Sequence, residues 1–207
     1  MLIPFYKKGC VEAGVDEAGR GCLAGPVVAA AVILRAGYRN EGLNDSKKLS
    51  RVHREELKAE IIEDALDYGI GMADNLEIDH LNVLQATMLA MHRAIGGLKT
   101  VPEFLIIDGN RFNPFRNIPH QCLVKGDALY MSIAAASILA KTHRDEMMRK
   151  LVPEYPEYGW ERNVGYPTRG HRAAIRKFGV TPLHRNSFRL YATQMELFNP
   201  EPGHRKI

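Results

Sequence analysis

Residues 14–21, with the sequence Gly-Val-Asp-Glu-Ala-Gly-Arg-Gly, place two adjacent acids, Asp16 and Glu17, at the end of a short apolar run. Neighbouring side chains on a strand point to opposite faces, so two adjacent acids serve one surface only where the strand ends and the backbone turns. The glycines allow that turn and leave bare backbone N–H groups beside Arg20. Carboxylates next to an anion-accepting loop suggest a divalent metal ion that meets a phosphate. The alternative is an ordinary exposed acidic turn.

The composition is that of one soluble globular domain. The 207 residues are 45% apolar and 25% charged, which is enough material for a core. Three cysteines, Cys10, Cys22 and Cys122, form no close pair in the sequence, which indicates a reducing compartment. The longest apolar stretch, residues 24–34, is too short to cross a bilayer, and nothing near the amino terminus resembles a signal peptide. We therefore expect a cytoplasmic protein.

The charge is divided unevenly along the chain. Residues 141–207 carry 13 Lys/Arg and 7 Asp/Glu, whereas residues 1–140 carry 15 and 17. The acidic residues thus predominate in the first two thirds and the basic residues in the last third. This polarity suits a polyanionic partner, although a solvated basic surface explains it equally well.

The hydrophobic pattern predicts a mixed α/β fold. Strands are expected at residues 11–15, 24–34, 68–73, 104–107 and 122–124. Helices are expected at residues 51–66, 75–95, 129–150 and 168–178. This order is typical of a mixed central sheet flanked by helices. We expect one domain over residues 1–185 and a helical carboxy-terminal extension over residues 186–207.

Four carboxylates stand at three of the predicted strand ends. Asp16 and Glu17 close the first strand, Asp108 closes the fourth, and Asp127 follows the short fifth one. A single acid at such a place is usually a turn residue or a helix cap, and Asp127 alone could be the N-cap of the long helix. If the four converge, their repulsion raises their pKa values unless cations neutralise them. Oxygen ligands favour Mg²⁺ or Mn²⁺, and no Cys/His pair has the spacing of a zinc site.

Several separated motifs together resemble ribonuclease HII, the RNase H type 2 family. They are residues 14–21, Asp45-Ser46-Lys47, Ile107-Asp108-Gly109, Lys125-Gly126-Asp127, residues 134–141 with Arg144-Asp145, and Gly165-Tyr166-Pro167-Thr168 with His171. The resemblance covers roughly residues 10–190 and is specific, because the motifs agree in order and spacing. It implies an RNase H-like fold and a metal-dependent endonuclease. Members cleave the RNA strand of RNA–DNA hybrids and nick duplex DNA 5′ to embedded ribonucleotides, leaving a 5′-phosphate and a 3′-OH.

The resemblance also implies roles for individual residues. Asp16, Glu17, Asp108 and Asp127 match the catalytic, metal-binding carboxylates of a two-metal mechanism with Mg²⁺ or Mn²⁺. The substrate-binding positions that match are Gly19, Arg20 and Gly21, which sense the 2′-OH, Tyr166, which stacks on a sugar, and Lys47, which lies near the scissile phosphate. His171 could approach the phosphates, or it could be a histidine on a helix surface. Val164 departs from the family, which often has lysine there.

For several other residues, the sequence favours a structural role over a functional one. His184 and Arg185 are expected to anchor the tail, and Lys141, Arg144 and Asp145 to form local ion pairs on a solvated helix face. Four aromatic residues are expected to pack in the core: Phe112, Phe115, Tyr155 and Trp160. We expect a monomer, because no heptad or long apolar stripe requires an oligomer.

Two other functions compete with the ribonuclease. One is a DNA-directed nuclease or integrase of the same superfamily, for which a 2′-OH-sensing Gly-Arg-Gly segment would have no purpose. The other is a non-catalytic nucleic-acid-binding module, which explains the basic last third but leaves four strand-end acids beside a polyanion that they would repel. Which metal is preferred, which substrate dominates and what the tail does stay open at this stage.

Overall fold

The computed structural model describes residues 2–43 and 49–191. The predicted substrate contact of Lys47 and residues 192–207 of the predicted tail lie outside this part of the chain. Within it, no helix is both long and apolar enough to cross a membrane.

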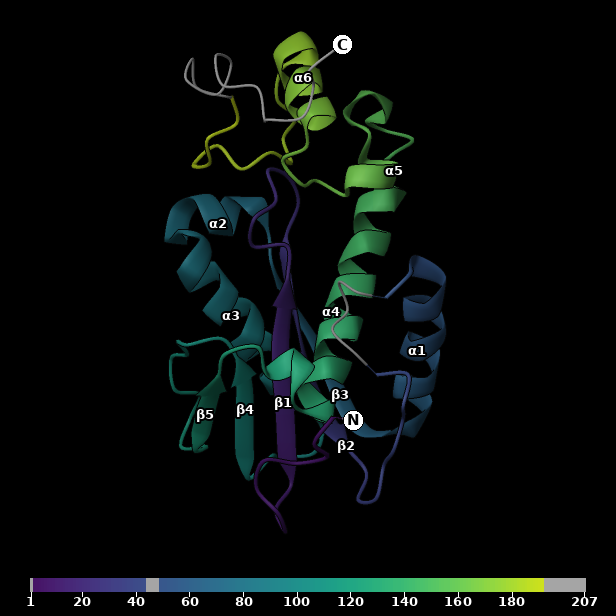
Figure 1. Cartoon of the computed structure of the whole chain (residues 1–207). Coiled ribbons are helices and arrows are strands. Elements are labelled where there is room, and N and C mark those ends of the chain that lie inside the picture. Colours follow the sequence, from purple (N-terminus) through teal and green to yellow (C-terminus); the bar gives the residue numbers. More distant parts are fainter. Residues whose placement is uncertain (1, 44–48, 192–207) are drawn as a thin grey trace, which may run out of the picture.

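A mixed sheet of five strands forms the centre of the molecule, as the sequence predicts (Figure 1). The strands are β1 (Glu12–Ala18), β2 (Val27–Leu34), β3 (Ala65–Ala73), β4 (Phe104–Asp108) and β5 (His120–Leu123). Their order in the sheet is β3-β2-β1-β4-β5. The first three strands form an antiparallel meander, whereas β4 and β5 run parallel to β1. The carboxyl ends of β1, β4 and β5 therefore meet at one edge of the sheet.

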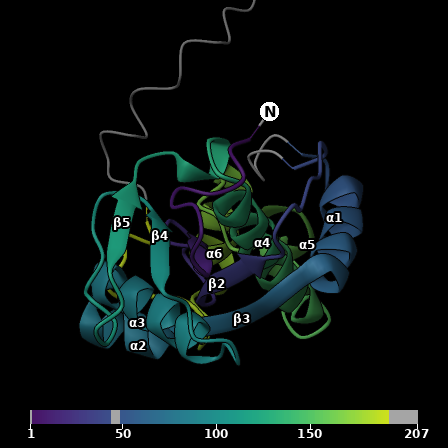
Figure 2. The same cartoon turned by 90° about the horizontal axis from the view of Figure 1, so that it is seen from below.

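Helices cover both faces of the sheet (Figures 1 and 2). They are α1 (Arg51–Asp64), α2 (Asn75–Leu81), α3 (Val83–Gly96), α4 (Met131–Lys150), α5 (Trp160–Asn163) and α6 (Arg169–Phe178). Two short 3₁₀ turns, η1 (Gly126–Ala128) and η2 (Pro156–Tyr158), complete the described elements. Helix α3 packs against β1, β2 and β3 on one face, and α4 packs against β1 and β2 on the other, with α1 outside it.

The alternation of side chains along β2 divides the core into two layers. Ala29, Ala31 and Ile33 belong to the layer beneath α3, whereas Ala30 and Val32 belong to the layer beneath α4 and α1. All five side chains are buried, which explains why β2 is a continuous apolar run. The same alternation places every second residue of β1 toward α4.

Close contact between β1 and α4 depends on a glycine. A Cβ atom built on Gly14 would overlap the backbone of Ser132 and Ile133 in the first turn of α4. The small side chains in the following turn, Ala134 to Ala136, are fully buried. The helix therefore lies directly on the sheet, as its run of small residues indicates.

One predicted helix is two helices in the structure. Asn82 lies between α2 and α3 with φ +70°, a left-handed conformation that ends α2. Its side-chain oxygen accepts hydrogen bonds from the backbone N–H groups of Leu84 and Gln85, so the same residue caps α3. The apolar periodicity of residues 75–95 runs through both helices and gave no sign of the break.

Residues 151–191 form a carboxy-terminal cap beyond the upper end of the sheet in Figure 1. Its core contains Trp160 and Ile175, which are fully buried and pack with Leu23, Ala24 and Met148. The cap thus covers the loop that follows β1. Residues 186–191, the described part of the predicted helical extension, are turns and bends without a helix.

Candidate active site

The first two carboxylates leave neighbouring parallel strands at the same level. Val15 of β1 pairs with Ile107 of β4, and this pairing ends there. The next residues, Asp16 and Asp108, therefore stand side by side. Val15 and Ile107 both belong to the core layer beneath α3, so Asp16 and Asp108 both face α4. The expected meeting of strand-end acids is present for this pair.

The sequence predicted that the first strand ends at Asp16 and Glu17, and this prediction is wrong. Glu17 and Ala18 stay paired with Ala29 and Val28 of β2, so β1 continues to Ala18. Only the ladder with β4 stops before Asp16. The side chains of Asp16 and Glu17 therefore point to opposite faces of β1, just beyond the last residue pair that β1 forms with β4.

Asp108 is linked to the segment that carries Asp127. The backbone N–H of Gly126 donates a hydrogen bond of 2.7 Å to Asp108 Oδ1. A Cβ atom on Gly126 would lie 2.5 Å from Ile133 Cδ1, so a larger residue there would displace the Ile133 side chain of α4. Asp127 follows within η1, is 5% exposed, and this turn contacts both β4 and α4.

The alternative role of Asp127 as the N-cap of the long helix does not describe the structure. The residue before α4 is Tyr130, which makes no side-chain capping bond, and Asp127 lies inside the preceding 3₁₀ turn. The burial of Asp127 beside the Asp108 segment is therefore not explained by helix capping.

Asp16 is the electrostatic centre of this group. Its side chain is 4% exposed. Burial raises the pKa of its carboxyl well above the usual range, and the negative charges of Glu17 and Asp108 raise it further. Hydrogen bonds from the Ser137 hydroxyl of α4 and from the backbone N–H of Glu17 lower it in part. Without a cation nearby, the ionised form of Asp16 is therefore strongly disfavoured.

Glu17 extends toward the glycine loop. Its Oε1 atom lies 3.1 Å from Nη1 of Arg20, whose side chain is half exposed. Because the Arg20 partner is open to solvent, this pair contributes little to stability. The contact shows instead that the loop of residues 19–21 lies directly beside the carboxylates.

The carboxylates supply the oxygen donors that a hard divalent cation prefers, although their side chains are not arranged as a complete coordination site. Within residues 2–43 and 49–191, no group of three or more His, Cys, Asp or Glu side chains is arranged to hold a metal ion. The donors are nevertheless all oxygen, and the hydrogen bonds to the buried Asp16 carboxylate offset its desolvation only in part, so a bound cation would stabilise its ionised form. We therefore judge that these residues fit Mg²⁺ or Mn²⁺, and the ligand role of each stays a prediction.

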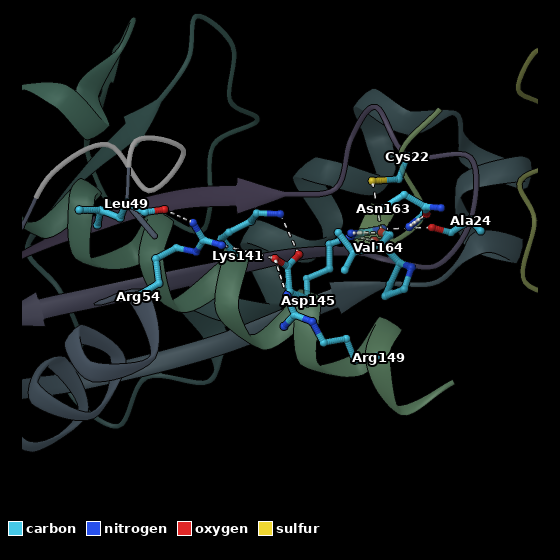
Figure 3. A network of polar contacts seen from close by, with 12 residues as sticks. Cys22, Ala24, Leu49, Arg54, Lys141, Asp145, Arg149, Asn163 and Val164 are labelled. Carbon is cyan, nitrogen blue, oxygen red and sulfur yellow. Dashed lines mark hydrogen bonds and ion pairs between the residues drawn. The ribbon is translucent and has the colours of Figure 1, made fainter. Parts of the chain in front are cut away.

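Helix α4 carries charged residues that are not on a solvated face, which corrects the prediction from the sequence. Arg144 is fully buried, and Asp145 is 3% exposed. Asp145 accepts from Lys141 at 2.8 Å and lies 4.0 Å from Arg54 and 3.9 Å from Arg149 (Figure 3). The predicted local ion pair of Lys141 exists, but it belongs to a buried network that joins α1 to α4.

Tyr166 lies at the border between α4 and the cap. Its ring is half-buried, with Lys141 Nζ at 5.1 Å and the Arg144 guanidinium carbon at 5.7 Å from its centroid. Both distances are typical of cation–π contacts, which hold the ring beside the helix.

His171 is fully buried, which differs from both roles considered for it from the sequence. Its Nδ1 atom lies 2.9 Å from the carbonyl oxygen of Tyr166. Its Nε2 atom lies 3.1 Å from Trp160 Nε1 and 3.2 Å from His184 Nε2. The ring therefore supports the Tyr166 main chain, and it has no access to a phosphate from this place.

Val164 and Arg185 are both buried near the loop that follows β1. Val164 is buried in the left-handed conformation at φ +41°, which is strained for a β-branched residue, and its carbonyl accepts from Arg144 at 2.8 Å. Arg185 was expected to anchor the tail, but its guanidinium binds the carbonyls of Gly19, Arg20 and Gly25. The only signal for this role in the sequence is the spacing of the glycines that surround it.

Comparison with known proteins gives one consistent result. The family model described as "Ribonuclease HII" matches residues 13–191. A curated relative named Ribonuclease HII, from Cytophaga hutchinsonii, is 56% identical over 198 residues, which cover 95% of this chain and 98% of that protein.

Two solved structures have the same fold. The PCNA:RNase HII complex from Archaeoglobus fulgidus has a TM-score of 0.73 at 25% identity, covering 91% of this chain and all of that chain. Bst-RNase HIII in complex with Mn²⁺ has a TM-score of 0.69 at 22% identity, covering 87% of this chain and 67% of that chain. The second similarity is evidence for the fold alone.

Proposed function

This chain belongs to the ribonuclease HII family and is an endoribonuclease, and from this premise we propose that it nicks duplex DNA 5′ to embedded ribonucleotides and cleaves the RNA strand of RNA–DNA hybrids. One observation carries the proposal. Asp16 and Asp108 face the same helix from neighbouring parallel strands, and Glu17, the residue after Asp16, contacts Arg20 of the loop of residues 19–21. Acids that hold a metal, next to backbone donors that hold a phosphate, are what phosphodiester hydrolysis requires.

Four residues would hold the metal. Asp16 interacts electrostatically with Glu17 and with Asp108, and Asp127 follows the Gly126 amide that binds Asp108. When bound, one or two Mg²⁺ or Mn²⁺ ions would supply an activated water and stabilisation of the leaving 3′-oxygen. The products expected are a 5′-phosphate and a 3′-OH.

The residues around the carboxylates orient the substrate. The backbone N–H groups and side chain of residues 19–21 would bind the phosphate and the 2′-OH of the ribonucleotide, which is the group that distinguishes RNA from DNA. The contact between Arg20 and Glu17 supports a role for Arg20 between the substrate and the acids that would hold the metal. The Tyr166 ring would stack on the sugar of the next nucleotide, which lacks that hydroxyl.

A duplex with a single ribonucleotide tests the proposal. With Mg²⁺, the protein should cut on the 5′ side of the ribonucleotide and leave an all-DNA duplex intact. Asp108→Asn should remove the cutting without loss of the folded state. Cutting of the all-DNA duplex would favour a DNA-directed nuclease instead, and binding without any cut would favour a non-catalytic module.

We propose that the enzyme acts as a monomer in the cytoplasm. The thiols Cys10, Cys22 and Cys122 are all free, as in a reducing compartment. Size-exclusion chromatography with light scattering would contradict the monomer if the mass were twice 23.2 kDa.

We also propose that residues 192–207 tether the enzyme to a ring-shaped clamp of the PCNA kind. The Archaeoglobus fulgidus relative was solved in complex with PCNA. In this chain, Gln194-Met195-Glu196-Leu197-Phe198 places three apolar side chains within four positions, outside the described residues. Large apolar side chains of this kind are suited to anchor a peptide in a pocket. The double variant Leu197→Ala, Phe198→Ala should lose binding to the clamp of the same cell and keep cleavage of free duplex; unchanged clamp binding would contradict the tether.

A further inference from the structure

Two arginines lie entirely inside the protein next to the candidate active site. Arg144 of α4 and Arg185 of the cap are both 0% exposed. Burying a guanidinium is costly unless its N–H groups are hydrogen-bonded. All six of their described hydrogen bonds go to main-chain carbonyl oxygens, three from each side chain.

Arg185 makes hydrogen bonds to main-chain carbonyls of residues 19–26, the loop between β1 and β2. Its Nη2 donates to Gly19 O at 2.8 Å, its Nη1 to Arg20 O at 2.9 Å, and its Nε to Gly25 O at 3.0 Å. The backbone adds one more link, because the N–H of Arg185 donates to Leu23 O at 2.9 Å. One side chain thus fixes both ends of the loop.

Arg144 joins the same loop to the segment that carries Tyr166. Its Nε donates to Pro26 O at 2.9 Å and its Nη2 to Ala24 O at 3.1 Å, both at the end of the loop. Its Nη1 donates to Val164 O at 2.8 Å, two residues before Tyr166. The strained conformation of Val164 is held in part by this bond.

The glycines of both segments make room for these side chains. A Cβ atom on Gly19 would overlap Arg144 Nε, and a Cβ atom on Gly165 would lie 3.3 Å from Arg144 Nη2. Gly19 and Gly165 also have positive φ values, of +94° and +88°. Their lack of a side chain therefore serves the close approach of the backbone to the buried cation.

The carbonyl bonds determine which way the loop amides point. In a planar trans peptide, the C=O and the following N–H point in opposite directions. Because the carbonyls of Gly19 and Arg20 turn inward to Arg185, the N–H groups of Arg20 and Gly21 turn away from it. Successive N–H groups that point the same way bind anions.

We propose that Arg144 and Arg185 are positioning residues that fix residues 19–21 and 164–166 relative to each other and turn the loop N–H groups toward the substrate. This inference rests on the proposed function for its substrate. Neither arginine touches the nucleic acid. They act through the loop and through Tyr166, so their loss weakens binding of the ribonucleotide more than it slows the chemical step.

Arg185 keeps its positive charge although its side chain is buried. Burial lowers the pKa of Arg185 to about 10, and the nearby charge of Arg144 lowers it too, so Arg185 stays protonated at neutral pH. A lysine keeps the charge, but its three N–H donors leave one nitrogen, so it cannot reach the three carbonyls that the guanidinium binds from three separate nitrogens.

Arg185→Lys and Arg144→Lys test the proposal, with Arg93→Lys as the matched control. Arg93 also donates to a main-chain carbonyl, that of Met72, but on α3, away from the loop. On a duplex with one ribonucleotide, each of the two test variants should raise KM about tenfold with kcat changed less than about threefold. Amide hydrogen exchange of residues 19–21 should become faster in Arg185→Lys, while β1 and β2 stay protected.

The outcomes separate this inference from the proposed function. Unchanged KM and unchanged loop exchange in folded Arg185→Lys would overturn the positioning role. Failure of the unmodified enzyme to cut would refute the proposed function, and the exchange measurement would still decide the positioning role. If Arg185→Lys is too unstable, Arg185→Ala with millimolar methylguanidinium should recover the slow loop exchange, whereas methylammonium should not; equal effects of the two would also overturn the inference.

Discussion

The Nε2 atoms of His171 and His184 lie 3.2 Å apart, and both rings are fully buried. The partners assign the protons. The backbone N–H of Thr181 donates to His184 Nδ1, so the proton of His184 sits on Nε2 and is donated to His171. Trp160 Nε1–H donates to the same His171 nitrogen, and His171 Nδ1–H donates to Tyr166 O. The network is complete only when both histidines are neutral.

Acid should therefore destabilise the protein through this pair. Burial and the neighbouring His171 lower the pKa of His184 from 6.5 to about 4, and burial lowers the pKa of His171 as well. The unfolded chain then binds more protons between pH 6.5 and 4, so the free energy of unfolding falls as the pH falls through this range. In His184→Gln, we expect this decrease between pH 7 and 4.5 to be smaller by about 2 kcal/mol. Urea unfolding at several pH values measures it. The exposed His53→Gln is the control and should keep the full slope.

Asp16→Asn should stabilise the metal-free protein while it inactivates the enzyme. The pKa of Asp16 is raised by burial first, then by Glu17 and Asp108, so its contribution to stability is present below the unfolded pKa and lost as the pH rises through the folded value. Removal of this titratable carboxyl should raise Tm by a few degrees at pH 7, roughly the effect of 1 kcal/mol. Cleavage should fall at least about 100-fold.

Mg²⁺ gives a second readout of the same variant. The ion should raise the Tm of the unmodified protein more than that of Asp16→Asn, because only the former has the full set of carboxylates. Glu12→Gln, a buried acid at the other end of β1, should keep both cleavage and the Mg²⁺ response. Mg²⁺-dependent cleavage by Asp16→Asn at the normal rate would remove Asp16 from the site.

Gly14→Ala should destabilise the fold, because its Cβ would overlap the Ser132 backbone and push α4 away from β1. We expect a loss above about 3 kcal/mol in chemical denaturation. Gly170→Ala is the matched control, since nothing lies within 4 Å of its Cβ position in α6. Helix propensity predicts that this change is neutral or stabilising by up to about 1 kcal/mol. Equal effects of the two would show that the close packing of α4 on β1 is not required.

Tyr166 should act through its ring rather than its hydroxyl. Tyr166→Phe keeps the ring that lies beside Lys141 and Arg144, and should keep kcat/KM within a small factor. Tyr166→Ala removes the stacking surface and should lower kcat/KM on a single-ribonucleotide duplex about 10- to 100-fold. Cleavage assays on both variants decide this. A larger loss in Phe than in Ala would assign the function to the hydroxyl.

Much of the fold follows from local sequence pattern. The apolar runs that end at Leu34 and Asp108 mark strands because buried strands need continuous apolar residues. The small residues of α4 predict its close contact with the sheet. The break at Asn82 was missed, because an apolar face continues across it and only the left-handed backbone shows the end of α2.

The sequence by itself determined the family, the succession of strands along the chain and the acids that follow apolar runs, because these depend on short segments. The tertiary structure alone decided that Arg144, His171 and Arg185 are buried. Their partners are carbonyls and rings far along the chain, and Arg185 lies 160 to 166 positions from the loop that it holds. A charged side chain stays inside a protein only where distant segments supply enough acceptors, and no local pattern records that supply.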